Sequence, residues 1–165
     1  MKKESCGVFG TVCQDKNLTS SLIYNGLVSL QHRGQESGGI SVLTDSRVKL
    51  KKFMGLTVDN LPKSLLTKMK GNIGIGHVRY TTVGHSTLKD AQPFRINYPK
   101  HGLVLAHNGN IVNYMNLKKE LSENGRPLNS GCDAEILINV LAEELIKTKD
   151  LEDVVLSLME RLSPH

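Results

Sequence analysis

Apolar and polar residues alternate in blocks along the chain, and the spacing inside each block predicts an element of secondary structure. Short apolar runs bounded by turn residues are typical of strands. The runs of this kind are residues 7–13, 39–43, 48–53, 72–80, 94–98 and 103–107. Thr44, Asp45 and Ser46 separate the second run from the third, which predicts a hairpin, and a turn at 99–102 separates the last two.

Apolar residues at helical spacing mark five further blocks. These predict helices over residues 19–31, 61–69, 113–124, 134–147 and 151–162. Pro62 lies in the first turn of the second block, where proline is tolerated, and Gly125 gives a usual C-terminal signal after the third. Strands occur in hairpins rather than in strict alternation with helices. This order favours an α+β fold, with antiparallel sheet and helices packed on its faces.

Composition narrows the class of protein. A chain of 165 residues with 39% hydrophobic and 22% charged residues suits one folded domain with a core, and aromatic residues of only 4% make that core aliphatic. No apolar run is long enough to span a membrane, and no apolar stretch follows the N-terminal lysines as in a secretory signal. The net charge of +5 comes without an arginine-rich arm or an aromatic platform, so it does not predict nucleic-acid binding.

The cysteines indicate the compartment. Cys6, Cys13 and Cys132 are odd in number and form no CxxC pair. This pattern argues against a disulfide framework or a structural zinc site, and it favours a reducing, cytoplasmic environment.

Two segments far apart in the sequence supply a candidate nucleophile and a candidate oxyanion hole. Cys6 precedes an apolar strand, where it is either a thiol nucleophile or a small buried residue. Asn108 and Gly109 follow the apolar run that ends near His107, so they form either an oxyanion hole or a plain turn. No histidine is marked by its surroundings as a base, although His77 and His107 lie at strand ends.

Three charged residues suit the recognition of an amino acid. Arg79 ends a buried strand, where it either binds a carboxylate with two hydrogen bonds or forms a surface ion pair. Asp133 precedes a helix and either caps it or receives an ammonium group. Arg33, in a glycine-bounded loop, is either structural or part of a site. Together with the cysteine, these residues predict attack on the side-chain amide of a bound amino acid.

The motifs that contain these residues resemble the class II glutamine amidotransferases, which are N-terminal-nucleophile hydrolases. The matching segments occur in the family order, at residues 6–10, 30–40, 74–80, 106–110 and 132–135. Within the class, Gln31–Gln35, His107–Asn110 and Gln92–Phe94 resemble the purine-synthesis branch, whose second domain is a phosphoribosyltransferase. The glutaminase half of another class II member is the alternative.

The resemblance implies a four-layer αββα sandwich with mainly antiparallel sheets. It implies that glutamine is hydrolysed to glutamate and ammonia, and that the ammonia feeds formation of 5-phosphoribosylamine from phosphoribosyl pyrophosphate. Cys6 would be the nucleophile and its α-amino group the base, with Asn108 and Gly109 as the oxyanion hole. The residues implied to bind glutamine are Arg79, Asp133, Thr82, Arg33 and Gly34.

Two departures from the family pattern carry further expectations. Five residues precede Cys6, so residues 1–5 are expected to be a propeptide and residues 6–165 the amidotransferase domain. Without cleavage the chain would be a catalytically silent fragment. The relatives also continue beyond this length, so we expect a C-terminally truncated domain whose phosphoribosyltransferase partner is missing.

The family also suggests which ligands and partners belong outside this segment. No cofactor or metal is expected within it. The Mg²⁺ of the parent enzyme, and the 4Fe-4S cluster of some members, would have their ligands elsewhere. The full-length enzyme is expected to be a homo-oligomer, with no nucleic-acid or membrane partner.

Overall fold

The computed structural model describes residues 6–45, 47–80, 87–99, 102–148 and 150–162, and the chain divides into two compact units, Met1–Asn108 and Gly109–His165. The first unit holds both sheets. Its elements are β1 (Gly7–Val12), α1 (Thr19–Leu30), a 3₁₀ turn (Gln31–Arg33), β2 (Ser37–Leu43), β3 (Val48–Met54), α2 (Thr57–Asn60), α3 (Lys63–Leu66), β4 (Ile73–Arg79), β5 (Phe94–Ile96) and β6 (Leu103–Leu105).

The larger sheet has the strand order β1-β4-β2-β3, and every neighbouring pair is antiparallel. Its register sets Gly7 opposite Val78 and Gly39 opposite His77. The strands β5 and β6 form a separate antiparallel pair. The expected antiparallel α+β organisation is therefore confirmed, including the hairpin between β2 and β3.

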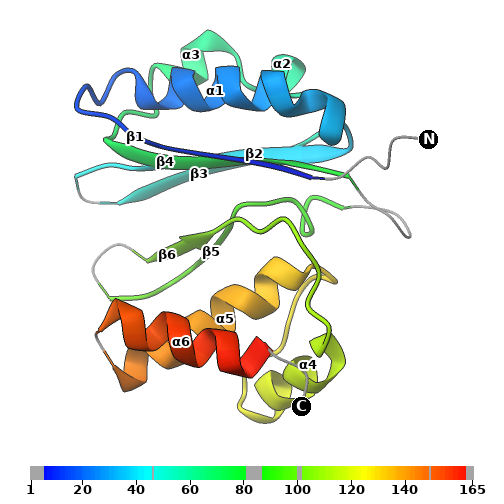
Figure 1. Cartoon of the computed structure of the whole chain (residues 1–165). Helices are drawn as coiled ribbons and strands as arrows, with labels where there is room; N and C mark the ends of the chain where they lie inside the picture. The colour runs from blue at the N-terminus through cyan, green and yellow to red at the C-terminus, as the bar shows by residue number, and fades with distance from the viewer. Residues whose placement is uncertain (1–5, 46, 81–86, 100–101, 149, 163–165) are drawn as a thin grey trace. The chain divides into compact units, whose positions relative to one another are not determined.

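The helix α1 lies along one face of the four-stranded sheet, with α2 and α3 on the same side and the β5–β6 pair on the other (Figure 1). Ile23 and Leu27 of α1 are fully buried in the main core. Glycine allows this close approach, since a Cβ on Gly76 of β4 would lie 2.5 Å from Ile23. On the helix, a Cβ on Gly26 would lie 2.3 Å from the Phe9 ring.

The helix expected over residues 61–69 is wrong in extent. Within this range only α3 is helical, from Lys63 to Leu66, and a separate single turn, α2, precedes it and ends at Asn60. A residue before proline is disfavoured in the helical region. Leu61, which precedes Pro62, accordingly has φ −117° and ψ 73° and separates the two turns. The strands expected at 94–98 and 103–107 are shorter than predicted, whereas β2 begins earlier, at Ser37.

The second unit is helical, with α4 (Tyr114–Glu123), α5 (Asp133–Lys147) and α6 (Leu151–Leu162). Helix α5 contacts both α4 and α6. Gly125 has φ +74°, and the N–H of Arg126 donates to the carbonyl of Leu121, so α4 ends as the glycine signal predicted. Among the helices that the structure describes, none is long and apolar enough to cross a membrane.

Candidate active site

The start of β1 and the end of β4 lie side by side in the larger sheet and bring the first group of candidate residues together. Cys6 directly precedes β1, and Arg79 is the last residue of β4. Because Gly7 pairs with Val78, the antiparallel register carries Cys6 to the end of β4. The Cys6 thiol is half-buried and lies 3.7 Å from the carbonyl oxygen of Tyr80.

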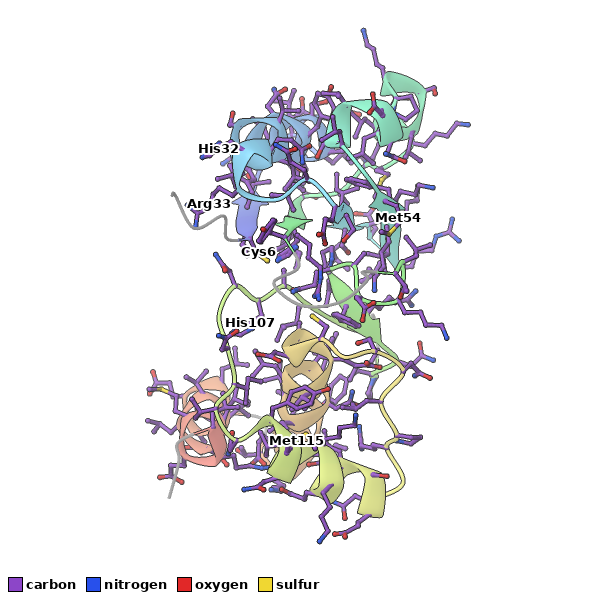
Figure 2. The ribbon with its side chains drawn as sticks, turned by 90° about the vertical axis from the view of Figure 1, so that its right-hand side faces the viewer. Cys6, His32, Arg33, Met54, His107 and Met115 are labelled. Carbon is purple, nitrogen blue, oxygen red and sulfur yellow. The ribbon has the colours of Figure 1, made fainter. Side chains whose placement is uncertain are left out.

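The carbonyl oxygen of Cys6 accepts hydrogen bonds from two candidate side chains. Arg33 donates from Nε at 3.1 Å, and Asn108 donates from Nδ2 at 2.8 Å. These residues are 27 and 102 positions away in the sequence. Figure 2 shows the Cys6 and Arg33 side chains close together at this edge. The fold thus places a thiol, a guanidinium and a carboxamide donor around one peptide group.

Gly34 lies against the backbone of β4. A Cβ at this position would be 2.6 Å from the carbonyl carbon of Arg79, so the close approach requires glycine. Gln31 supports the loop from within, since its Nε2 donates to the Gly34 carbonyl and its Oε1 accepts from the N–H of Thr57 at 2.7 Å. Sequence reasoning gave Gln31 no role of its own, because a glutamine in a helix end carries no signal of such a bridge.

Arg79 is half-buried, and its Nη1 donates to the backbone carbonyl of Asp90 at 3.2 Å. The bond connects the end of β4 to the segment that precedes β5. Thr82, the neighbouring candidate, lies outside the described residues.

His77 and Gln92 hold the backbone of His107 next to the candidate oxyanion donor. The His107 N–H donates to Gln92 Oε1 at 2.7 Å, and its carbonyl accepts from Gln92 Nε2 at 3.1 Å and from His77 Nε2 at 3.2 Å. Figure 2 labels His107 below Cys6. Gln92 is a site residue that sequence reasoning used only as part of the family resemblance.

His77 is fully buried, and burial lowers its pKa to about 4. The hydrogen bond to His107 opposes this shift, while the positive charge of Arg79 and the side chain of His107 add to it. The ring is therefore neutral at physiological pH. A base with this pKa binds almost no protons near neutrality, so His77 is poorly matched to take a proton from a thiol.

Gly109 and Asp133 belong to the second unit. The capping alternative for Asp133 is wrong, because Cys132 occupies the capping position with φ −92° and ψ 131°, and Asp133 is the first helical residue. Its Oδ2 instead accepts a hydrogen bond from the N–H of Ile111 at 2.8 Å. Glu135, two residues further along, accepts from the N–H groups of Asn129 and Ser130. The carboxylates at the start of α5 thus organise the two segments that precede helices.

The part of the chain that the structure describes contains no cluster of metal ligands. No group of three or more histidine, cysteine, aspartate or glutamate side chains is arranged there to hold an ion. Cys6, Cys13 and Cys132 are all unbridged.

Comparisons with known proteins connect this site to one family. The model of the "Glutamine amidotransferase domain" family matches residues 62–149, more than half of the chain. The amidophosphoribosyltransferase of Methanothermobacter thermautotrophicus is 41% identical over 143 residues, which are 86% of this chain and 30% of that protein. The Escherichia coli enzyme of the same name is 45% identical over 125 residues, 74% of this chain and 25% of that protein.

Two solved structures that match this chain belong to proteins of the same kind. The glutamine phosphoribosylpyrophosphate amidotransferase of B. subtilis, solved with ADP and GMP, matches with a TM-score of 0.78. A structure described as the allosteric regulatory enzyme of purine biosynthesis matches with a TM-score of 0.81. In both, 32% of the aligned residues are identical, and the match covers 93% of this chain and 32% of the other. These matches confirm the expected fold class. The chain spans about a third or less of the length of these relatives. It belongs to the glutamine amidotransferase domain family.

Proposed function

We propose that this chain is the glutaminase part of an amidophosphoribosyltransferase, and that it hydrolyses glutamine to glutamate and ammonia with Cys6 as the nucleophile. One observation carries the proposal. The carboxamide of Asn108 lies 2.8 Å from the carbonyl oxygen of Cys6, although the two residues are 102 positions apart. A thiol beside a fixed amide donor is the pairing that acyl transfer requires.

The chemistry follows from that pairing. The Cys6 sulfur attacks the side-chain carbonyl carbon of glutamine, and the carbonyl oxygen gains the negative charge. The second N–H of the Asn108 carboxamide and the N–H of Gly109 stabilise this oxygen. The C–N bond then breaks, the nitrogen leaves as ammonia with the proton taken from the thiol, and a thioester remains. Water attacks the thioester, which releases glutamate and restores the thiol.

The base in this mechanism is the α-amino group of Cys6. A free α-amino group has a pKa of about 7.7–8.0, which suits proton transfer near neutrality. An amide nitrogen has no such basicity, so residues 1–5 form a propeptide that must be cleaved at the Ser5–Cys6 bond. The hydrogen bonds from Arg33 and Asn108 to the Cys6 carbonyl hold the new terminus in place.

Two charged side chains select glutamine by the charges on its α-carboxylate and α-ammonium groups. Arg79 binds the α-carboxylate, Asp133 binds the α-ammonium, and Arg33, Gly34 and Thr82 surround the substrate. Neutral amides that lack these two charges would lose both ion pairs, so the site favours a free amino acid over a peptide.

Replacement of Asp133 by asparagine tests the ammonium contact. Asparagine keeps an oxygen that accepts the N–H of Ile111 but removes the charge. A hydrogen bond to a charged group contributes about 1.5–3 kcal/mol, so the KM for glutamine should rise roughly 10- to 100-fold with little change in kcat. Steady-state glutaminase kinetics measure both constants. An unchanged KM would show that Asp133 only organises the backbone at Ile111.

The proposal itself is tested by assaying purified chain for ammonia and glutamate from glutamine, together with intact mass and N-terminal sequencing. We expect the two products in equal amounts from chains that begin at Cys6, and none from chains that retain residues 1–5. Hydrolysis by a chain whose N-terminus is still Met1 would refute the α-amino base. Absence of hydrolysis from a chain that begins at Cys6 would refute the glutaminase assignment.

The rest of the proposed enzyme lies outside this chain. The ammonia would be used by a phosphoribosyltransferase domain acting on phosphoribosyl pyrophosphate, as the names of the relatives suggest. Mg²⁺ and any 4Fe-4S cluster would be held by that further part of the protein. We also propose a cytoplasmic location, in line with the three unbridged cysteines. The full-length enzyme is proposed to be a homo-oligomer, on the family resemblance alone.

A further inference from the structure

The backbone of His107 is held at both of its polar atoms by buried side chains. Gln92 makes a two-point contact, accepting from the His107 N–H at 2.7 Å and donating to its carbonyl at 3.1 Å. His77 donates to the same carbonyl at 3.2 Å. The side chains of His77 and Gln92 are both almost completely buried.

The carbonyl held in this way belongs to the peptide bond between His107 and Asn108. A peptide group is planar, so fixing its oxygen also fixes the direction of the Asn108 N–H and limits where the Asn108 side chain can start. That side chain donates to the Cys6 carbonyl at 2.8 Å. A continuous set of hydrogen bonds therefore runs from His77 and Gln92 through one peptide group to the residue beside the nucleophile.

We propose that His77 and Gln92 are positioning residues of the glutaminase site, which together hold the His107–Asn108 peptide so that the Asn108 carboxamide can serve as the oxyanion donor. This inference rests on the proposed function and deepens it. An oxyanion donor must lie about 2.7–3.1 Å from the developing charge, and a misplacement near 1 Å can lower the rate about 100-fold.

A glycine in β2 makes room for this arrangement. His77 pairs in register with Gly39 of β2, and a Cβ on Gly39 would lie 2.5 Å from the backbone oxygen of Gln92. Only a residue without a side chain lets the Gln92 segment lie directly over β2. The glycine therefore brings the Gln92 carboxamide and the His77 ring to the same peptide.

The chemistry of the two side chains explains their residue types. A carbonyl oxygen can only accept, so the neutral imidazole of His77 carries its proton on Nε2. Its Nδ1 is buried without a hydrogen-bond partner among the described residues, which is unusual for a group kept only for packing. The contact of Gln92 needs both a donor and an acceptor, whereas an ionised glutamate can only accept, and asparagine is one methylene shorter.

Variants of His77 give the decisive test in the processed full chain. His77→Leu removes the donor, whereas His77→Gln retains an N–H at similar reach. We expect His77→Leu to lower kcat about 10- to 100-fold with the KM for glutamine changed less than about 3-fold, and His77→Gln to recover most of kcat. Gln92→Glu, which loses the donor, should resemble His77→Leu.

The control is a buried hydrogen bond of the same kind on the other side of the sheet. Ser20 of α1 is buried and donates to the Leu66 carbonyl at 2.9 Å. Ser20→Ala should lower the melting temperature while leaving kcat unchanged. If His77→Leu behaves in the same way, or if His77→Gln stays as slow as His77→Leu while folded, the positioning role is refuted.

A second readout separates this inference from the glutaminase assignment. The side-chain NH₂ resonances of Asn108 in ¹⁵N-labelled protein report its contact with Cys6 whether or not glutamine is hydrolysed. We expect them to shift in His77→Leu and to return toward the wild-type positions in His77→Gln. Unshifted resonances in His77→Leu would overturn the positioning role, even if the wild-type chain proved to be a glutaminase.

Discussion

Replacement of Cys6 by alanine should reduce glutamine hydrolysis to the uncatalysed background while the fold persists. The thiol sulfur is the only protein atom in the proposed mechanism that forms a bond to substrate carbon, so its loss removes the nucleophile. Only the half-buried thiol is lost, and its weak contact with the Tyr80 carbonyl at 3.7 Å contributes little stability. Ammonia release measures the activity, and thermal unfolding measures the fold.

The Ser5–Cys6 bond adjoins the substituted residue, so both versions should be produced without residues 2–5 to keep cleavage out of the comparison. Removal of the initiator methionine then leaves residue 6 at the N-terminus. Cys13→Ala is the matched control, because Cys13 is also half-buried and unbridged but lies at the other end of β1. Ammonia release by Cys6→Ala at the Cys13→Ala rate would refute the assigned nucleophile.

The sequence predicted the local elements well where the pattern is strong. The helix over residues 151–162 has the predicted bounds, and Gly7–Val12 and Ile73–Arg79 fall inside the predicted runs. Periodicity depends on side chains that alternate between water and core, and the burial of β1 alternates in this way along the strand. It was only partly right at residues 61–69, where the restriction on Leu61 before Pro62 delays the helix to Lys63 and the helix ends at Leu66.

The site was predictable only in part, for a physical reason. Cys6, Arg33 and Asn108 were singled out from the chain, and the structure brings them to one carbonyl group. That meeting depends on strand register and loop path, which residue spacing does not encode. Gln92 and Gln31 were missed as individual residues because a buried glutamine that bonds to backbone leaves no periodic or charge signal.

Removal of Arg161 should give the largest loss of stability in the helical unit. Its guanidinium donates to Glu144 at 2.7 Å, to Glu143 at 3.0 Å and to Glu120 at 2.6 Å, so one side chain links α6 to α5 and α4. The Glu144 side chain is only 3% exposed. Breaking a buried ion pair by removing one partner costs about 3–5 kcal/mol, and we expect Arg161→Leu to lower the free energy of unfolding by about 3 kcal/mol.

Denaturant unfolding measures this loss, and hydrogen exchange of α5 and α6 locates it. Lys119→Leu is the control, because its pair with Glu123 spans 3.9 Å with side chains 79% and 67% exposed. An exposed pair of this kind contributes at most about 1 kcal/mol. Equal effects of the two substitutions would show that burial does not strengthen the Arg161 contacts.

The pH dependence of stability should identify Glu144 as the residue behind this effect. Burial alone would raise its pKa, but hydrogen bonds from Lys147, Ser157 and Arg161 outweigh burial and lower the pKa from 4.5 to about 2. A lowered pKa stabilises the fold above pH 4.5, and this contribution is lost as the pH falls from 4.5 toward 2. Glu144→Gln should therefore flatten the acid limb of the stability curve. Because glutamine keeps the shape but not the charge, an unchanged acid limb would place the titration on another carboxylate.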